Sequence, residues 1–177
     1  MYVPIILGTA RKGRQSEKVA NFIFEQCKKN GLDTEIIDVR DFLIGATDNS
    51  KKISESKKLT KIVKNSDGLI IVSPEYNHSF PGELKIMLDM LFEEYSGKAV
   101  GICGVSGGNF GGTRMVEELN KLILTINMIP TNTPLYFPDV KDMFDLNGKT
   151  KNEKLIKRSR IFFGVLKKYI NASKKLK

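Results

Sequence analysis

Residues 8–16, with the sequence GTARKGRQS, place a glycine, hydroxyl side chains and three cations between two apolar runs. The glycine spacing is similar to that of a triphosphate-binding loop, but Arg14 and Gln15 stand where that motif needs a lysine and a hydroxyl residue. The Gly-x-Gly-x-x-Gly pattern of dinucleotide-binding loops is absent as well. A glycine turn that leads into a helix still exposes backbone amides, and the helix dipole favours an anion there. The segment therefore predicts a site for one phosphate group, with a capped helix and solvated arginines as the alternative.

Five side chains of this segment are candidates for binding that phosphate. The two arginines can donate charge-assisted hydrogen bonds, and the threonine, glutamine and serine can donate neutral ones. Ser16 also stands where the N-cap of the following helix is expected. The candidate phosphate ligands are Thr9, Arg11, Arg14, Gln15 and Ser16.

The segment SPEYNHSFPGELK, residues 73–85, combines turn-forming residues with two aromatic rings and an imidazole. A turn needs the proline, asparagine and glycine for backbone reasons alone, but it does not need Tyr76, His78 or Phe80. Such a loop can lay backbone amides along the polar edge of a planar heterocycle. His78 is the only histidine of the chain, so no metal site is expected, and a surface or hydrogen-bonding role is favoured over catalysis.

A third polar segment, GVSGGNFGG at residues 104–112, is rich in glycine. Glycines between a strand and a helix let the backbone approach a ligand closely or adopt unusual φ angles. Phe110 could cover an aromatic ligand, or it could pack over the edge of the sheet. This loop alone does not decide between the two.

Apolar runs with strand character alternate with amphipathic helical patterns along the chain. The strands are expected at residues 3–7, 34–39, 69–73, 99–105 and 129–137. The helices are expected from Ser16, around Leu59, from Pro81, around Leu119 and over residues 152–172. The third of them should carry an apolar stripe of Leu84, Met87, Leu88, Leu91 and Phe92. This alternation predicts a three-layer α/β domain with a parallel sheet. Ligands of such sheets bind at the carboxyl ends of the strands, where the three polar loops lie.

Composition sets the general class of the protein. With 177 residues, 41% hydrophobic and 28% charged, residues 1–177 are expected to form a single globular domain. The apolar runs are too short to span a bilayer, and the N-terminus lacks a signal-peptide pattern. The two cysteines, Cys27 and Cys103, have no metal-type spacing. A cytoplasmic protein with reduced, packed thiols and no membrane partner is therefore expected.

The net charge of +9 has two interpretations. Solvated basic faces are favoured, especially in the lysine-rich stretches at residues 51–64 and 151–177. Weak binding of nucleic acid through the basic surface is the alternative. Since no helix-turn-helix, zinc or RNA-binding signature is present, no specific nucleic-acid partner is expected.

Taken together and in this order, the three loops resemble the NADPH-dependent FMN reductase family of flavodoxin-like proteins, which includes quinone, azo-dye and chromate reductases. The segment PEYNHSFPGELK looks like the family signature Pro-Glu-Tyr-Asn-x-Ser-x-Pro-Gly-x-Leu-Lys, and Asp89 also fits. GTARKGRQS is similar to the phosphate loop of the family, and SGGNFGG to its later glycine loop. The resemblance runs from about Tyr2 to Pro138. Ile86 departs from it, because the family commonly has asparagine after the lysine.

The resemblance implies a fold and a cofactor. The fold is a flavodoxin-like three-layer sandwich whose five-stranded parallel sheet has the order 2-1-3-4-5, and the cofactor is FMN. The five candidate ligands of the first loop would hold the FMN phosphate. The isoalloxazine ring would be lined by Pro74, Glu75, Tyr76 and Asn77, partly through backbone amides, and met from the third loop by Ser106, Gly107 and Gly108.

The resemblance also implies an activity. NADPH or NADH would pass a hydride to flavin N5, and a small acceptor such as a quinone, an azo compound, chromate or free flavin would then be reduced. Since the flavin performs the redox step, no side chain is named as catalytic. A homodimer or homotetramer is expected. The alternatives are a flavodoxin-type electron carrier, although such carriers are usually acidic, and a nucleotide-binding regulatory module that has lost its flavin.

Overall fold

The computed structural model describes residues 1–145 and 149–175 of the chain. Its strands are β1 (Ile5–Leu7), β2 (Ile36–Asp38), β3 (Gly68–Pro74), β4 (Ala99–Val105), β5 (Ile129–Pro130) and β6 (Leu135–Phe137). Its α-helices are α1 (Ser16–Lys29), α2 (Ser54–Asn65), α3 (Gly82–Leu88), α4 (Thr113–Thr125), α5 (Val140–Met143) and α6 (Glu153–Lys174). Two 3₁₀ turns, η1 (Val39–Phe42) and η2 (Glu93–Tyr95), complete the described elements.

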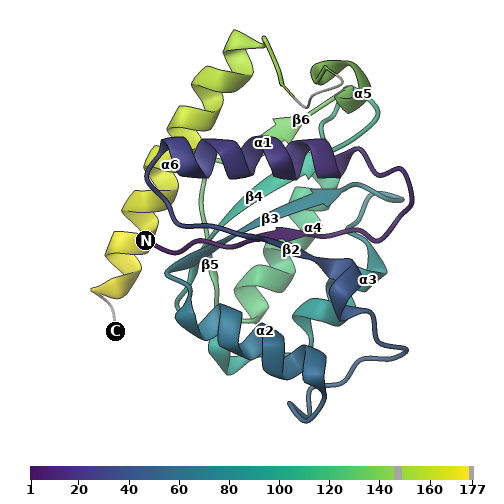
Figure 1. Ribbon diagram of the computed structural model, residues 1–177, viewed down its shortest axis with the longest axis vertical. Coiled ribbons are helices and arrows are strands. Elements are labelled where there is room, and N and C mark those ends of the chain that lie inside the picture. The colour runs from purple at the N-terminus through teal and green to yellow at the C-terminus, as the bar shows by residue number, and fades with distance from the viewer. Residues whose placement is uncertain (146–148, 176–177) are drawn as a thin grey trace.

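The strands form one parallel sheet in the order β2-β1-β3-β4-β5, with β6 also paired to β4 (Figure 1). The expected order 2-1-3-4-5 is confirmed, because β5 and β6 are two pieces of the expected strand at residues 129–137. The residues between these pieces include Pro134, which has no N–H to donate to a ladder. The central strands β3 and β4 are buried along their whole length, as their continuous apolar sequences predict.

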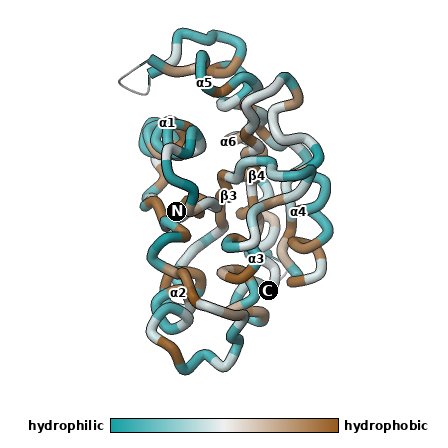
Figure 2. The backbone as a smooth tube through the Cα atoms, turned by 90° about the vertical axis from the view of Figure 1, so that its right-hand side faces the viewer, coloured by the Kyte–Doolittle hydropathy of each residue, from teal (hydrophilic) through white to brown (hydrophobic). Residues whose placement is uncertain are grey.

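Helices cover both faces of the sheet, so the expected three layers are present. One hydrophobic cluster joins α1 and α6 to the sheet through residues such as Ile23 and Phe162. A second cluster joins α2, α3 and α4 to the other face through residues such as Leu59, Leu84 and Leu119. Hydrophobic and hydrophilic segments alternate along α2 in Figure 2, as expected of a helix with one buried side.

Two local expectations are wrong. Helix α3 ends at Leu88, so the apolar stripe stops short of Phe92, whose backbone is not helical and whose side chain is 52% exposed. Tyr95 of η2, which is fully buried, fills the core beyond Leu91 instead. Ser16 is not the N-cap of α1 but its first helical residue, because Gln15 occupies the cap position without a side-chain cap bond.

The two cysteines are free and buried, as expected. Burial raises the pKa of the Cys27 thiol to about 12 and that of Cys103 well above its ordinary value. Within residues 1–145 and 149–175, no cluster of histidine, cysteine and acidic side chains could hold a metal ion. None of the described helices is long and apolar enough to cross a membrane.

Candidate functional site

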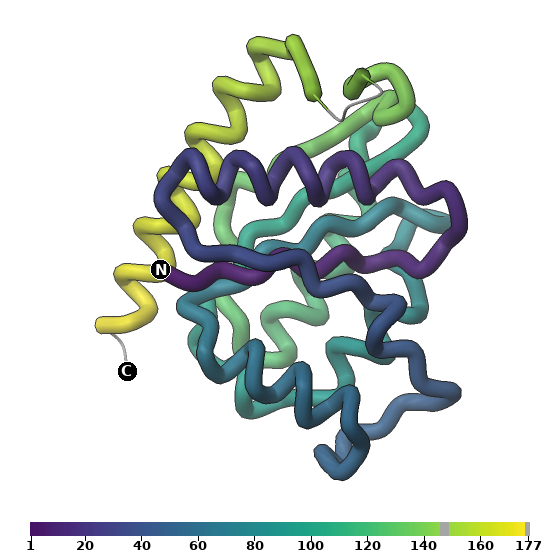
Figure 3. Tube along the Cα trace, viewed as in Figure 1, coloured from purple at the N-terminus to yellow at the C-terminus, as the bar shows by residue number. Residues whose placement is uncertain are grey.

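Three loops meet at the carboxyl edge of the sheet: the first loop (residues 8–15), the second loop (residues 75–81) and the third loop (residues 106–112). They follow β1, β3 and β4, which are neighbours in the sheet with Leu7 paired to Val72 and Pro74 paired to Val105. Figure 3 shows the turn from β1 into α1 at the edge where β3 also ends. The chain leaves β1 for β2 on one side, while β3 lies on the other, so this edge is a topological switch point.

Thr9 is the centre of a hydrogen-bond cluster in the first loop. Its side chain is fully buried, and its hydroxyl lies 3.0 Å from the hydroxyl of Tyr76 in the second loop. The same hydroxyl donates to Oε1 of Glu83 at 3.2 Å and accepts from the Arg11 amide at 3.3 Å. The Ala10 amide also donates to Glu83 Oε1, at 2.8 Å. A carboxylate of α3 is therefore bonded to the backbone and the hydroxyl of the first loop.

The glycine at the end of β1 explains why α3 reaches the first loop. A Cβ on Gly8 would lie 2.9 Å from Leu84 Cδ2, closer than real Cβ contacts allow. The bare glycine lets the first turn of α3 pack directly against the end of β1. Glu83, one residue before Leu84, is thereby held beside Thr9 and Ala10.

Arg14 points to the end of β2 rather than out of the first loop. Its guanidinium is paired with both carboxylate oxygens of Asp38 and donates to the Thr9 carbonyl at 2.5 Å. The hydrogen bond to Asp38 is the largest cause of a raised Arg14 pKa. Burial acts to raise the pKa of Asp38, but the bonds from Arg14 and from the Arg40 amide hold it below its ordinary value. Phosphate binding by Arg14 stays a prediction, and the described contacts assign its side chain to bracing the loop.

Two further arginines contact the first loop from opposite directions. Arg40 donates to the carbonyls of Ala10 at 3.2 Å and of Arg11 at 2.8 Å. These bonds hold the loop carbonyls toward η1. Arg11 is exposed, and its guanidinium lies 5.6 Å from the centroid of the Tyr76 ring, within cation–π range. Of the two arginines in the first loop, Arg11 is therefore the one whose guanidinium contacts the second loop.

Ser16 gives a direct test of whether the first loop fits a phosphate group. Its side chain is 2% exposed, and its hydroxyl has no hydrogen-bond partner within the described residues. Such a buried orphan is costly without a ligand, and here it lies in the first turn of α1, where free amides and the helix dipole favour an anion. Gln15, by contrast, folds back to donate to the Gly13 carbonyl at 3.2 Å. Ser16 fits the predicted role better than Gln15 or Arg14.

The second loop is a tight hairpin. Tyr76 and Ser79 exchange backbone hydrogen bonds of 2.9 and 3.0 Å, and the two residues between them, Asn77 and His78, have φ of +49° and +65°. Two consecutive positive φ angles are typical of a type I′ turn. The tip is exposed, so His78 is a surface residue, while Pro74 is buried at the end of β3. Tyr76 is half-buried between the loop tip and Thr9.

Glu75 ties the second loop to the third. Its amide donates to the Val105 carbonyl at 2.9 Å. Its carboxylate lies 3.5 Å from Nη1 of Arg114 and from the Met115 amide, in the first turn of α4. The Arg114 guanidinium in turn covers the exposed ring of Phe110, 4.8 Å from its centroid. The Glu75 side chain thus positions the two loops, and a contact of its backbone with the isoalloxazine stays a prediction.

The third loop is folded by Ser106 and open at its glycines. The Ser106 hydroxyl donates to the Gly108 carbonyl at 2.6 Å and accepts from the Gly111 amide at 3.0 Å. A Cβ added at Gly107 or at Gly108 would meet no atom within 4 Å. These two exposed glycines leave bare backbone beside open space, which is what the approach of a planar ring requires. Of the three predicted residues here, Gly107 and Gly108 have the accessible backbone.

Sequence reasoning missed four residues that shape this edge: Asp38, Arg40, Glu83 and Arg114. Asp38 is the last residue of β2 and Arg40 lies in η1, and this strand end carries no glycine loop and no motif. Glu83 stands at a variable position of the signature, between Pro-Gly and Leu-Lys, so the motif itself assigns it nothing. The one sequence signal for Glu83 was an acidic residue in a segment that is expected to lie beside the phosphate loop.

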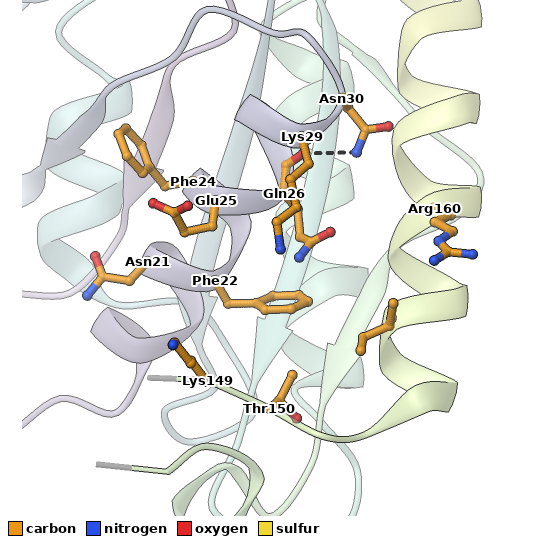
Figure 4. A pocket seen from close by; sticks show the side chains of 11 residues that line it. Asn21, Phe22, Phe24, Glu25, Gln26, Lys29, Asn30, Lys149, Thr150 and Arg160 are labelled. Atoms are coloured by element: carbon orange, nitrogen blue, oxygen red, sulfur yellow. Dashed lines mark hydrogen bonds between the residues drawn. The ribbon is translucent and has the colours of Figure 1, made fainter. Parts of the chain in front are cut away.

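A separate hollow of about 950 Å³ lies between α1 and α6. Figure 4 shows Phe22 of α1 and Arg160 of α6 lining it from two sides, with Asn30 donating to the Gln26 carbonyl at 2.9 Å. Among the described residues, no glycine lines this hollow, and none of the three loops contributes to it. This hollow is therefore separate from the edge of the sheet where the three loops meet.

The chain resembles known flavin reductases along most of its length. Residues 1–141 match the family model described as NADPH-dependent FMN reductase. An NADPH azoreductase from Bacillus sp. (strain OY1-2) is 30% identical over 145 residues, which are 80% of each chain. A quinone reductase from Pseudomonas putida is 26% identical over 159 residues, or 85% of each.

A solved structure confirms the flavodoxin-like α/β arrangement. FerB, a flavoenzyme NAD(P)H:(acceptor) oxidoreductase from Paracoccus denitrificans, superposes with a TM-score of 0.81 over 98% of this chain and 97% of its own, at 20% identity. The family match covers β1 to β6, and with them all three loops described above. The chain belongs to the NADPH-dependent FMN reductase family, and it is an FMN-dependent NAD(P)H oxidoreductase.

Proposed function

We propose that the protein binds FMN across the three loops and uses NADPH or NADH to reduce a small electron acceptor, such as a quinone or an azo compound. The orphaned, buried hydroxyl of Ser16 in the first turn of α1 is the observation that carries the placement of the phosphate. The bare backbone of Gly107 and Gly108 supports the placement of the ring.

The residues of the chain have distinct tasks in this proposal. The Ser16 hydroxyl, which has no hydrogen-bond partner within the described residues, and the first amides of α1 bind the phosphate at the positive end of the helix. Arg11 adds an exposed cation beside the Tyr76 ring. Arg14 and Arg40 hold the loop backbone in place through its carbonyls. Asp38 keeps the Arg14 guanidinium in position.

The ring would be bound mainly by backbone. The tight turn at Asn77 and His78 fixes the amides of the second loop, and the bond between Thr9 and Tyr76 fixes that loop against the first. Gly107 and Gly108 leave open space beside their backbone for a flat ligand. When bound, FMN supplies the two-electron redox chemistry itself. We assign no side chain to proton transfer, since His78 lies at the exposed tip of the second loop.

The absorbance spectrum of the purified protein, followed by anaerobic titration with NADPH, tests this function. A flavin spectrum that bleaches with NADPH and recovers when a quinone is added supports the reductase. A flavin spectrum that NADPH does not bleach would favour the electron carrier. Protein that is colourless and takes up no added FMN would sink the placement at the three loops.

We also propose a homodimer or homotetramer in the cytoplasm. Three large apolar side chains, Phe92, Phe110 and Leu124, are each more than half exposed in and beside α3 and α4. Burial of these side chains in a contact with a second copy would remove that apolar surface from water. Light scattering coupled to size-exclusion chromatography measures the mass directly, and a monomer at micromolar concentration would contradict the assembly.

A further inference from the structure

We propose that Glu83 is a specificity-determining residue, which sets how strongly the site prefers FMN over riboflavin. Its carboxylate occupies hydrogen-bond donors of the first loop that a phosphate monoester would otherwise use. The proposal rests on the proposed placement of the FMN phosphate at the first loop. It concerns a residue at a variable position of the signature, so the family motif does not assign it a role.

The contacts of Glu83 are those of an anion in an anion site. One oxygen, Oε1, accepts from the Ala10 amide at 2.8 Å and from the Thr9 hydroxyl at 3.2 Å. A backbone amide and a hydroxyl at the end of a strand are donors of the kind that bind phosphate. Thr9 was predicted as a phosphate ligand from its sequence position, and in the structure its donor is directed to this carboxylate.

The surroundings hold this carboxylate where it is. The contact between Gly8 and Leu84 brings the first turn of α3 against the first loop. The Tyr76 hydroxyl lies 3.0 Å from the Thr9 hydroxyl, so Thr9 can accept from Tyr76 while it donates to Glu83. Arg40 binds the carbonyls of Ala10 and Arg11 on the other side of the loop. The loop is therefore braced with its Ala10 amide directed to Glu83.

A phosphate and this carboxylate compete for the same donors. FMN must either displace Glu83 from Ala10 and Thr9 or bind beside a like charge, and both lower the affinity for FMN. Riboflavin has the same ring and no phosphate, so Glu83 does not oppose it in this way. Glu83 thus reduces the preference of the site for FMN over riboflavin.

Quenching of flavin fluorescence, measured for FMN and for riboflavin with the same apoprotein preparations, tests the proposal. Glu83→Gln keeps the size and the acceptor oxygen but removes the charge, and Glu83→Ala removes the acceptor as well. The matched control is Glu118→Gln, which removes the same charge from a carboxylate that pairs with Lys121 on the outside of α4. Thermal melting of each apoprotein reports whether the variant folds, and the isosteric Glu83→Gln keeps the test available if the alanine variant melts early.

We expect both Glu83 variants to bind FMN about tenfold more tightly than the unmodified protein, a change well within the energy of two like charges at close range. Riboflavin affinity should change less than about twofold, and the Glu118 variant should match the unmodified protein for both flavins. An unchanged or smaller ratio of FMN to riboflavin affinity in the Glu83 variants overturns the proposal, and weaker FMN binding would mean that Glu83 positions the loop for the phosphate.

The same titrations separate this proposal from the function on which it rests. If the unmodified protein binds FMN and oxidises NADPH while the flavin preference of the Glu83 variants is unchanged, only the role of Glu83 fails. If neither the protein nor its variants bind either flavin, the three-loop site fails and the Glu83 proposal with it.

Discussion

The Arg14 guanidinium, buried beneath the first loop, is bonded to both carboxylate oxygens of Asp38 at the end of β2. The pair joins two segments that are 24 residues apart in sequence. Arg14 also donates to the Thr9 carbonyl at 2.5 Å, so the pair fixes the loop backbone as well as the strand end. Arg14, which the sequence suggests as a phosphate ligand, therefore holds the first loop against the end of β2 in its described contacts.

Asp38→Asn should destabilise the fold, because it leaves the buried Arg14 guanidinium with only the exposed Glu17 carboxylate, 3.5 Å from its Nε, as an anionic partner among the described residues. We expect a loss of about 2 kcal/mol in the free energy of unfolding, below the usual cost for a fully buried pair since Asp38 is partly exposed. Urea denaturation followed by circular dichroism measures it. Asp41→Asn, which breaks the exposed pair with Lys58, is the matched control and should cost less than about 0.5 kcal/mol. Equal stability of the two variants would contradict a structural role for Arg14.

The same pair predicts an acid sensitivity. The pKa of Asp38 is lower in the folded protein than in the unfolded chain, so the carboxylate contributes stability at pH values above its unfolded pKa of about 3.9. That contribution is lost as the pH falls through the lower folded pKa. Between about pH 4 and pH 2, the unfolding free energy of the unmodified protein should therefore fall more steeply than that of Asp38→Asn. If the unfolding free energies of the two proteins, measured by urea titration at several pH values, fall in parallel, the pKa of Asp38 is not lowered in the folded protein.

The glycines of the third loop offer a test of where the ring binds. Gly107→Val should lower FMN affinity by at least about tenfold, because its side chain extends into space that no protein atom occupies but a ligand would. The fold should tolerate it, since the φ of Gly107 is not positive. Gly45→Val is the matched control, as a Cβ there also meets nothing within 4 Å, in a loop outside the site. Fluorescence titration with FMN gives both affinities, and an equal effect of the two substitutions would remove the ring from the third loop.

Ser16→Ala separates a ligand-binding hydroxyl from a structural one. The hydroxyl has no hydrogen-bond partner among residues 1–145 and 149–175, so its removal should leave the stability of the apoprotein within about 0.5 kcal/mol. FMN affinity should nevertheless fall by roughly threefold to tenfold, the worth of one hydrogen bond. Ser56→Ala is the counterpart, because that buried hydroxyl donates to the Ile53 carbonyl at 3.0 Å. It should lower the melting temperature without changing FMN binding. The reverse pattern would exclude Ser16 from the phosphate site.

The sheet and the position of its loops were predictable from the sequence because β1, β3 and β4 are continuous apolar runs and the longer helices have a buried stripe. Strand β4 falls where its pattern places it. Phe92 was placed wrongly because helical spacing says nothing about where a helix ends, and here Tyr95 fills the core instead. The short helix α5 carries too few residues for a period to be visible.

The candidate site was predictable at the level of its loops but not of its individual side chains. A motif places Arg14 and Glu75 in the right loops, whereas their partners Asp38 and Arg114 come from other elements and are visible only in three dimensions. Each of the three loop motifs is a short continuous segment, whereas the charge pairs at the sheet edge join residues far apart in the sequence. A charged side chain can turn either to a ligand or to a neighbouring element, and its sequence position does not distinguish the two.

The bonds from Asp38 and Arg40 to the first loop have a consequence for dynamics. Strand β2 is the outermost strand on its side of the sheet and pairs only with β1 among the described strands, so it is a natural place for local opening. Each opening of its end would release both bracing residues, and with them the backbone of the first loop. Occupation of the loop by a ligand should therefore slow hydrogen exchange at the amides of β2, a strand outside the proposed flavin contacts. Hydrogen exchange at the edge strand β2 would then report whether a ligand occupies the first loop.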